Sequence, residues 1–215
     1  MGSGGPIYLG GDETKPPLPK EITGPVTADA ARVEYQLIDG TTIDARLYAL
    51  PDVLRAPAKA FVVFVPNDVL VVAGDMVAYD SSGNELGHEY TDFSPVWLSP
   101  KMIAEAPPDA LAVMRSLQVA GAVAARYYDT HAQSFVGLDP ANAMAISDAV
   151  TFNASPTAIA GEVSLRVAGK DKLVLASTTS AGHVYAVCFE FGPGSGLYAQ
   201  NDPVTPGACS NDGWL

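Results

Sequence analysis

The most regular pattern in this chain is PDALAVMRSLQVAGAVAARYYDTHAQSF, which runs from Pro108 to Phe135. From Leu111 to Tyr128 its apolar residues recur at spacings of three and four, which is the period of one helix face. Pro108 suits the first turn of a helix, and Asp109 is favourable at the positive end of the helix dipole. The pattern predicts a helix of about twenty residues, roughly 30 Å long.

Small residues fill the second half of this predicted helix and let another backbone approach it closely. We expect five residues to form its packing or interface surface: Gln118, Gly121, Ala122, Ala124 and Tyr128. One interpretation is a helix buried in the core of its own domain. In the other, part of this surface, including an exposed Gln118 and Ala122, meets a neighbouring subunit.

The residues before the helix divide into two parts. Residues 1–30 are rich in Gly and Pro and show neither helical nor strand periodicity, which predicts a linker. Residues 31–98 alternate with period two around turns at Asp39-Gly40 and at 80–84, which predicts a small antiparallel β module.

A continuous apolar run from Ala60 to Val65 is typical of a central strand of that module. Prolines from Pro95 to Pro108 separate the module from the helix. We therefore divide the chain into a linker (1–30), a β module (31–98) and a third region (99–215). In this third region, alternation returns at 163–167, 173–176 and 184–191, which predicts an antiparallel sheet for the helix to cover.

The chain has two cysteines, Cys188 and Cys209. Cys188 lies in a predicted strand, whereas Cys209 lies in a tail rich in Gly, Pro, Asn and Asp. A disulfide between them would close a loop of about twenty residues, contribute roughly 3 kcal/mol in the chain-entropy model and indicate an oxidising compartment. Two free thiols or a metal pair are the alternatives, although no CxxC motif or clustered histidine accompanies the cysteines.

The order of these elements resembles the globular part of type IV pilins and pseudopilins. The resemblance rests on the helix with small apolar residues, on Tyr127-Tyr128 followed by Phe135, and on the later strands and cysteines, so it covers residues 108–215. It implies a helix packed on an antiparallel sheet, a disulfide-closed C-terminal region and an extracytoplasmic structural or binding protein. The sequence departs from the family in lacking the prepilin cleavage site and the hydrophobic half-helix, and in placing a β module before the helix.

The predicted fold class is α+β: an N-terminal small antiparallel β module, then a pilin-like long helix packed on an antiparallel β-sheet with a disulfide-closed C-terminal loop. The predicted function is that of a non-catalytic, exported bacterial protein of the cell surface or of a filament. Its expected partners are subunits of a surface assembly or further copies of itself. We expect contact with the membrane only through an N-terminal anchor or signal that is missing from this chain.

A ligand-binding sensor is the alternative function. In this interpretation the chain is the extracytoplasmic domain of a membrane-anchored regulator. A small molecule would then bind between the two modules, near Phe93, Trp97 and Tyr127.

Composition argues against other functions. The net charge is −12 at pH 7, so nucleic acid is not an expected partner. His88, His131 and His183 lie in separate segments without metal-ligand spacing, and no base accompanies Cys188, so we expect no catalytic residue and no metal site. Calcium is the one cofactor left open, at the Asp80–Glu85 turn or in a C-terminal loop. The oxygen-bearing residues of that loop are Asn201, Asp202, Asn211 and Asp212.

Overall fold

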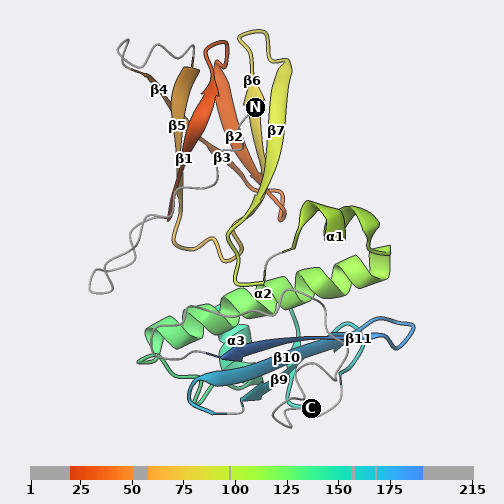
Figure 1. Cartoon of the computed structure of the whole chain (residues 1–215). Coiled ribbons are helices and arrows are strands. Elements are labelled where there is room, and N and C mark those ends of the chain that lie inside the picture. Colours follow the sequence, from red (N-terminus) through yellow and green to blue (C-terminus); the bar gives the residue numbers. More distant parts are fainter. Residues whose placement is uncertain (1–19, 51–57, 97, 156–157, 168, 191–215) are drawn as a thin grey trace.

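The computed structural model describes residues 20–50, 58–96, 98–155, 158–167 and 169–190 (Figure 1). Within these residues, three helices and eleven strands are present. The helices are α1 (Pro100–Glu105), α2 (Pro108–Thr130) and α3 (Pro140–Ile146). The strands are β1 (Lys20–Thr27), β2 (Arg32–Leu37), β3 (Thr42–Asp44), β4 (Arg46–Ala49), β5 (Ala58–Val65), β6 (Ala73–Tyr79), β7 (Glu85–Asp92), β8 (Phe152–Asn153), β9 (Val163–Val167), β10 (Lys172–Thr178) and β11 (Val184–Glu190).

The α+β fold class predicted from the sequence, with a long helix on an antiparallel sheet, is wrong. The described chain is mainly β, because strands alternating with period two form three separate sheets. The first sheet has the order β1-β5-β4, the second β3-β2-β6-β7 and the C-terminal sheet β11-β10-β9-β8. The C-terminal sheet is mixed rather than antiparallel, since β8 runs parallel to β9. The regular helix spacing of α2 led the sequence-based prediction to overrate the helical part of a chain that is built mostly of short strands.

The first and second sheets pack face to face as a β-sandwich. Their inner faces share one hydrophobic core, to which β2 contributes Val33 and Tyr35 and β5 contributes Val63 and Val65, all at most 1% exposed. These residues occur at every second position of their strands, so one face of each sheet points into the core.

β1 lies within the stretch that the sequence analysis assigns to a linker. It pairs antiparallel with β5 along its whole length, from Lys20 opposite Val65 to Thr27 opposite Ala58. Pro25 is tolerated because β1 is an edge strand of the first sheet. Gly24 leaves room for an aromatic ring, since a Cβ there would lie 2.8 Å from the ring of Phe61. Gly24 and Pro25, which contribute to the linker prediction, are therefore part of a strand, whereas residues 1–19 of that stretch lie outside the described residues.

The second hydrophobic core lies between α2 and the C-terminal sheet. On the helix side, Leu117, Val123 and Tyr127 are buried, and they belong to the same cluster as Leu173 of β10 and Phe189 of β11. α2 lies between this sheet and the sandwich (Figure 1). Because one helix borders both parts of the molecule, its residues determine how the sandwich is attached.

Tyr35 provides a pH-dependent test of the sandwich core. Burial raises the pKa of its phenol to about 12, helped by the nearby Asp92 carboxylate. The unfolded chain loses this proton near the ordinary phenol pKa of about 10. The contribution of the protonated Tyr35 to the free energy of unfolding is therefore complete below pH 10 and is lost as the pH rises towards about 12. We expect Tyr35→Phe to flatten the fall in unfolding free energy over this interval in denaturant titrations. An unchanged pH slope in the variant would contradict this assignment.

Candidate functional site at the module junction

A polar cluster, half-buried except for one completely buried residue, joins the sandwich to α2. We call it the junction network, and it consists of Tyr90, Asp92, Ser94, Arg115 and Gln118. The first two residues lie in β7, Ser94 follows that strand, and the last two lie in α2. The contacts between the β7 end and α2 join residues 24 to 26 positions apart in sequence, so the network exists only in the folded chain.

Gln118 is the centre of the junction network and is completely buried. Its side-chain Nε2 donates to Asp92 Oδ2 at 2.7 Å, to Ser94 Oγ at 2.9 Å and to the Val96 carbonyl at 3.2 Å. Its Oε1 accepts from Arg115 Nη1 at 2.9 Å. Because a buried amide is costly unless its donors and acceptor are paired, this geometry fixes the position of α2 against the end of β7.

Asp92 organises the chain that leaves the sandwich. Its Oδ1 accepts from the Ser94 backbone N–H at 2.9 Å, and its Oδ2 accepts from the Leu98 backbone N–H at 2.9 Å. The Ser94 hydroxyl also contacts Asp92 Oδ1. One carboxylate therefore holds both ends of the connection between β7 and α1. Gln118 of α2 donates a hydrogen bond to the same carboxylate.

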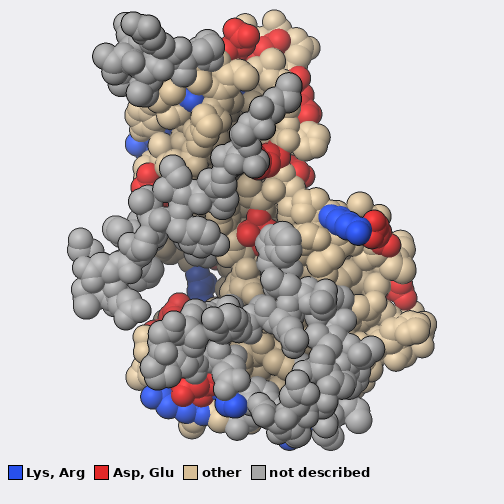
Figure 2. Space-filling model, in the orientation of Figure 1, with Lys and Arg blue, Asp and Glu red and all other residues tan. Residues whose placement is uncertain are grey.

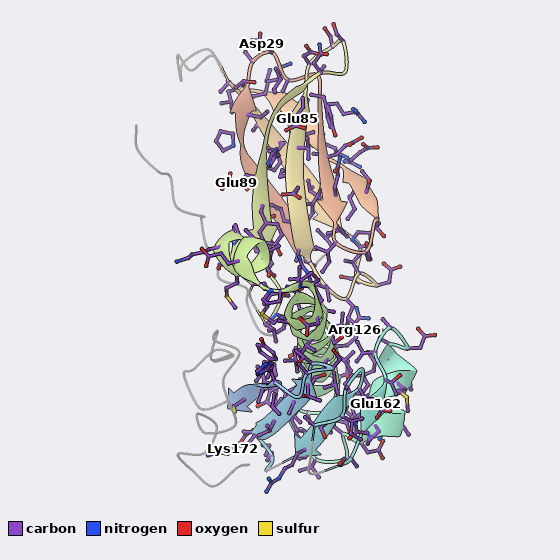
Figure 3. All side chains as sticks on the ribbon, turned by 90° about the vertical axis from the view of Figure 1, so that its right-hand side faces the viewer. Asp29, Glu85, Glu89, Arg126, Glu162 and Lys172 are labelled. Atoms are coloured by element: carbon purple, nitrogen blue, oxygen red, sulfur yellow. The ribbon has the colours of Figure 1, made fainter. Side chains whose placement is uncertain are left out.

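Arg115 extends the network to the second sheet. Its Nη1 approaches the Tyr90 hydroxyl at 3.3 Å, and burial raises the pKa of Tyr90. A further contact lies along the same helix, where Arg126 donates to the Asn67 carbonyl between β5 and β6. Figure 3 shows Arg126 beside α2, at the height between the sandwich and the C-terminal sheet. The helix is therefore attached to the sandwich at two points.

Apolar contacts accompany these hydrogen bonds. Val96, from the connection after β7, belongs to the core cluster of α2 and the C-terminal sheet, and Leu70 packs against that cluster. Gly121 allows this approach, because a Cβ there would lie 2.5 Å from Val96 Cγ2 and 3.0 Å from Phe189 Cζ. The predicted division at residues 98/99 remains a prediction, but Val96 contributes to the core on the far side of it.

The five helix residues singled out by sequence are all buried in the chain. Ala122, Ala124 and Tyr128 are 4%, 1% and 8% exposed, and the Tyr128 hydroxyl donates to Asp171 Oδ1 at 3.0 Å. The expectation that Gln118 and Ala122 lie on an exposed face of the helix is wrong. The hydrogen-bond partners of Gln118 were not predicted, because they come from the end of β7 and the connection after it, which give no local signal.

The expected disulfide falls partly outside the described residues. Cys188 lies in β11 opposite Val174 of β10, where it packs beside a small apolar cluster. Cys209 lies outside the described residues, and so do Asn201, Asp202, Asn211 and Asp212 of the expected calcium loop. The pairing and the calcium site stay predictions.

The three residues of the expected ligand pocket are not brought together as one described site. The Tyr127 ring stacks on His131 with the ring centroids 3.7 Å apart, and its hydroxyl donates to the Val136 carbonyl at 3.3 Å. Phe93 is 51% exposed. Trp97 lies outside the described residues. In the described structure, Tyr127 therefore contacts residues that follow the C-terminal end of α2.

The Asp80–Glu85 turn is closed by its own hydrogen bonds. Asp80 Oδ1 accepts from the backbone N–H groups of Ser82 and Asn84 at 2.8 and 2.9 Å, and Oδ2 accepts from Asn84 Nδ2 at 2.9 Å. These bonds lower the pKa of Asp80, the side-chain bond of Asn84 most of all. Both oxygens are thus used in forming the hairpin turn.

The histidines lie apart from one another. His88 contacts Glu85 at 2.7 Å, and this contact raises its pKa. His183 lies in the turn before β11, where its backbone N–H donates to Thr179 Oγ1 at 3.1 Å. Within the part of the chain that the structure describes, no three His, Cys, Asp or Glu side chains are grouped as metal ligands.

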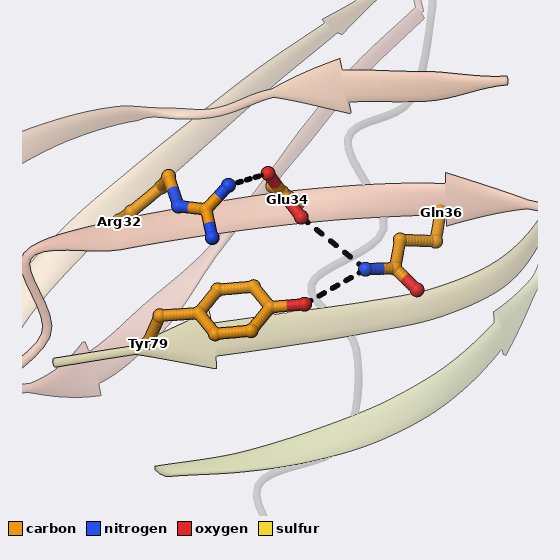
Figure 4. Close-up of polar contacts among 4 residues, drawn as sticks. All are labelled: Arg32, Glu34, Gln36 and Tyr79. Carbon is orange, nitrogen blue, oxygen red and sulfur yellow. Dashed lines mark hydrogen bonds and ion pairs between the residues drawn. The ribbon is translucent and has the colours of Figure 1, made fainter. Parts of the chain in front are cut away.

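A second polar cluster, not identified from the sequence, lies on the outer face of the second sheet (Figure 4). Arg32 and Glu34 form an ion pair, and Gln36 Nε2 donates to Glu34 Oε2 at 3.2 Å and to the Tyr79 hydroxyl at 2.8 Å. The Arg32 guanidinium also lies 4.3 Å from the centre of the Tyr79 ring. In the sequence, only the alternation of polar residues along β2 could have indicated this cluster. The cluster connects β2 to β6.

Acidic side chains are spread over both parts of the visible surface, and basic ones are few (Figure 2). None of the described helices is long and apolar enough to cross a membrane. Comparisons with models of protein families, with curated proteins and with solved structures found no match. The resemblance to type IV pilins therefore rests on the sequence pattern alone.

Proposed function

We propose that this chain is a non-catalytic, exported bacterial protein that acts as a structural subunit at the cell surface or in a surface filament. Its partners are further subunits of that assembly or copies of itself. The net charge of −12 supports protein partners over nucleic acid.

The observation that carries the proposal is the complete burial of Gln118 within the junction network. Together with the Arg126 contact, the network holds the sandwich and the C-terminal unit in one orientation. A subunit with a fixed joint orders few groups when it assembles, so less of its interaction energy is lost to conformational entropy. A sensor that closes on its ligand would instead need a joint that moves.

Export is tested by the redox state of the cysteines together with surface labelling. We expect antibodies against the sandwich to label intact cells that produce the full-length gene product. We also expect alkylation of Cys188 and Cys209 only after reduction. Reductant should lower the melting temperature of the wild type, consistent with a disulfide contribution of roughly 3 kcal/mol, and leave Cys209→Ser unaffected. Labelling only after permeabilisation, with both thiols alkylated without reduction, would reject the proposal.

A further inference from the structure

The outer face of the first sheet has the composition of a covered surface. From Ala60 to Val65, β5 is apolar on both sides: Phe61, Val63 and Val65 face the sandwich core, whereas Val62 and Phe64 alternate with them on the outside. A strand with one face in water normally alternates apolar and polar residues, and continuous apolar strands are typical of sheets covered on both faces.

The apolar character extends to the neighbouring strands. Pro25 of β1 and Tyr48 of β4 both lie opposite Ala60, and they therefore share its outer face. Tyr48 is 47% exposed and Phe64 is 39% exposed. Contiguous aromatic and aliphatic groups of this kind mark interaction surfaces on soluble proteins.

The charges on this face are few and opposite in sign. Glu21 lies on β1 opposite Phe64, and Arg46 lies on β4 opposite Val62, with its guanidinium 5.4 Å from the centre of the Phe64 ring. The face thus carries one acid on one edge strand and one base on the other. In a chain with 24 acidic and 12 basic residues, this balance lets two copies approach here without like-charge repulsion.

We propose that the outer face of the first sheet binds the same face of a second copy of this chain, forming a two-fold symmetric dimer. An axis parallel to the strands places β1 of each copy opposite β4 of the other. Glu21 of each copy then lies about 7 Å along the strand direction from Arg46 of the second copy, within reach of an arginine side chain. The aromatic rings fill the centre, and the two ion pairs set the orientation.

This inference deepens the proposed structural function by naming one of the surfaces through which subunits associate. Sedimentation velocity of the full chain, over a dilution series, should show a reversible monomer–dimer equilibrium. Phe64→Asp should raise the dimer Kd about thirtyfold or more, as expected for a central aromatic contact. Leu86→Asp is the matched control, since Leu86 is 43% exposed on β7 and the change adds the same charge; its Kd should stay at the wild-type value.

Charge reversal tests the orientation of the two copies. Glu21→Arg and Arg46→Glu should each weaken the dimer, and the double variant should recover most of the lost affinity because the pairs re-form with opposite sign. Melting temperatures near that of the wild type would show that these exposed changes leave the fold intact.

A chain that stays monomeric at all concentrations, or a dimer that survives Phe64→Asp, would overturn the inference. Binding of a monomer to lipid vesicles through this face would also overturn it. These outcomes leave the proposed function standing if the chain is exported and surface-exposed. Conversely, a dimer of the predicted kind in a chain that is never exported would reject the function and keep the interface.

Discussion

Gly74→Ala should lower the free energy of unfolding by about 3 kcal/mol, the upper range for a forced overpacking. Gly74 lies in β6 opposite Leu37 of β2, and a Cβ there would lie 2.0 Å from the Gln36 carbonyl oxygen and 2.8 Å from Leu37 Cα. Both are backbone atoms, so no rotamer change relieves the contact. The variant therefore has to separate β2 from β6, where the second sheet supplies much of the sandwich core.

Gly87→Ala is the matched control for this prediction. Gly87 lies in β7, next to β6 in the same sheet, and a Cβ there would meet nothing within 4 Å. The substitution should be neutral or should stabilise the fold slightly by restricting the unfolded chain. Denaturant unfolding of both variants measures the difference. Equal free energies for the two would show that β2 and β6 do not approach as closely as described.

Gln118→Glu should destabilise the chain by about 3–5 kcal/mol, the range for an uncompensated buried charge. The side-chain Nε2 that donates to Asp92, Ser94 and the Val96 carbonyl is replaced by an acceptor. The introduced carboxylate then faces Asp92 at the site of a 2.7 Å hydrogen bond. Arg115 alone cannot offset the repulsion between the two carboxylates, because it also donates to the Tyr90 hydroxyl.

Two further variants separate charge from shape at this position. Ala112→Glu places the same group on an exposed part of α2 and should change stability by no more than about 0.5 kcal/mol. Gln118→Met removes the hydrogen bonds without adding charge and should cost about 1–3 kcal/mol. The penalty of Gln118→Glu should shrink as the pH falls, since a protonated carboxyl can donate to Asp92. A Gln118→Glu variant as stable as Ala112→Glu would show that the junction is open to water.

Local turn chemistry in the sandwich was readable from the sequence. The Asp39-Gly40 turn is present, with Gly40 at φ +88° and the Thr41 N–H bonded to Asp39 Oδ1 at 2.8 Å. Gly83 plays the same part at φ +85° between β6 and β7. Such turns depend on a few adjacent residues, so a short stretch of sequence specifies them.

The division of the strands between sheets was not readable. Ile43, Ala45 and Leu47 alternate as one strand would, yet the chain leaves the second sheet after β3 and enters the first sheet at β4. All three side chains still pack against the same core. Because the two sheets of a sandwich share one interior, the alternation continues through the crossing and hides it.

The candidate site was harder to predict than the turns for a related reason. Gln118 lies within an apolar stripe, and its partners Asp92 and Ser94 precede it by more than twenty residues. No spacing rule connects a helix to a strand end or a loop at that distance. The exported location, the disulfide and the partners of the chain remain predictions from the sequence.

Calorimetric unfolding of the full chain tests most directly the claim that the junction network joins the two cores into one structural unit. The account predicts a single transition for the wild type, with equal calorimetric and van't Hoff enthalpies. It also predicts that Gln118→Glu separates the unfolding of the sandwich from that of the C-terminal unit. Two independent transitions in the wild type, with the sandwich transition unmoved by Gln118→Glu, would contradict it.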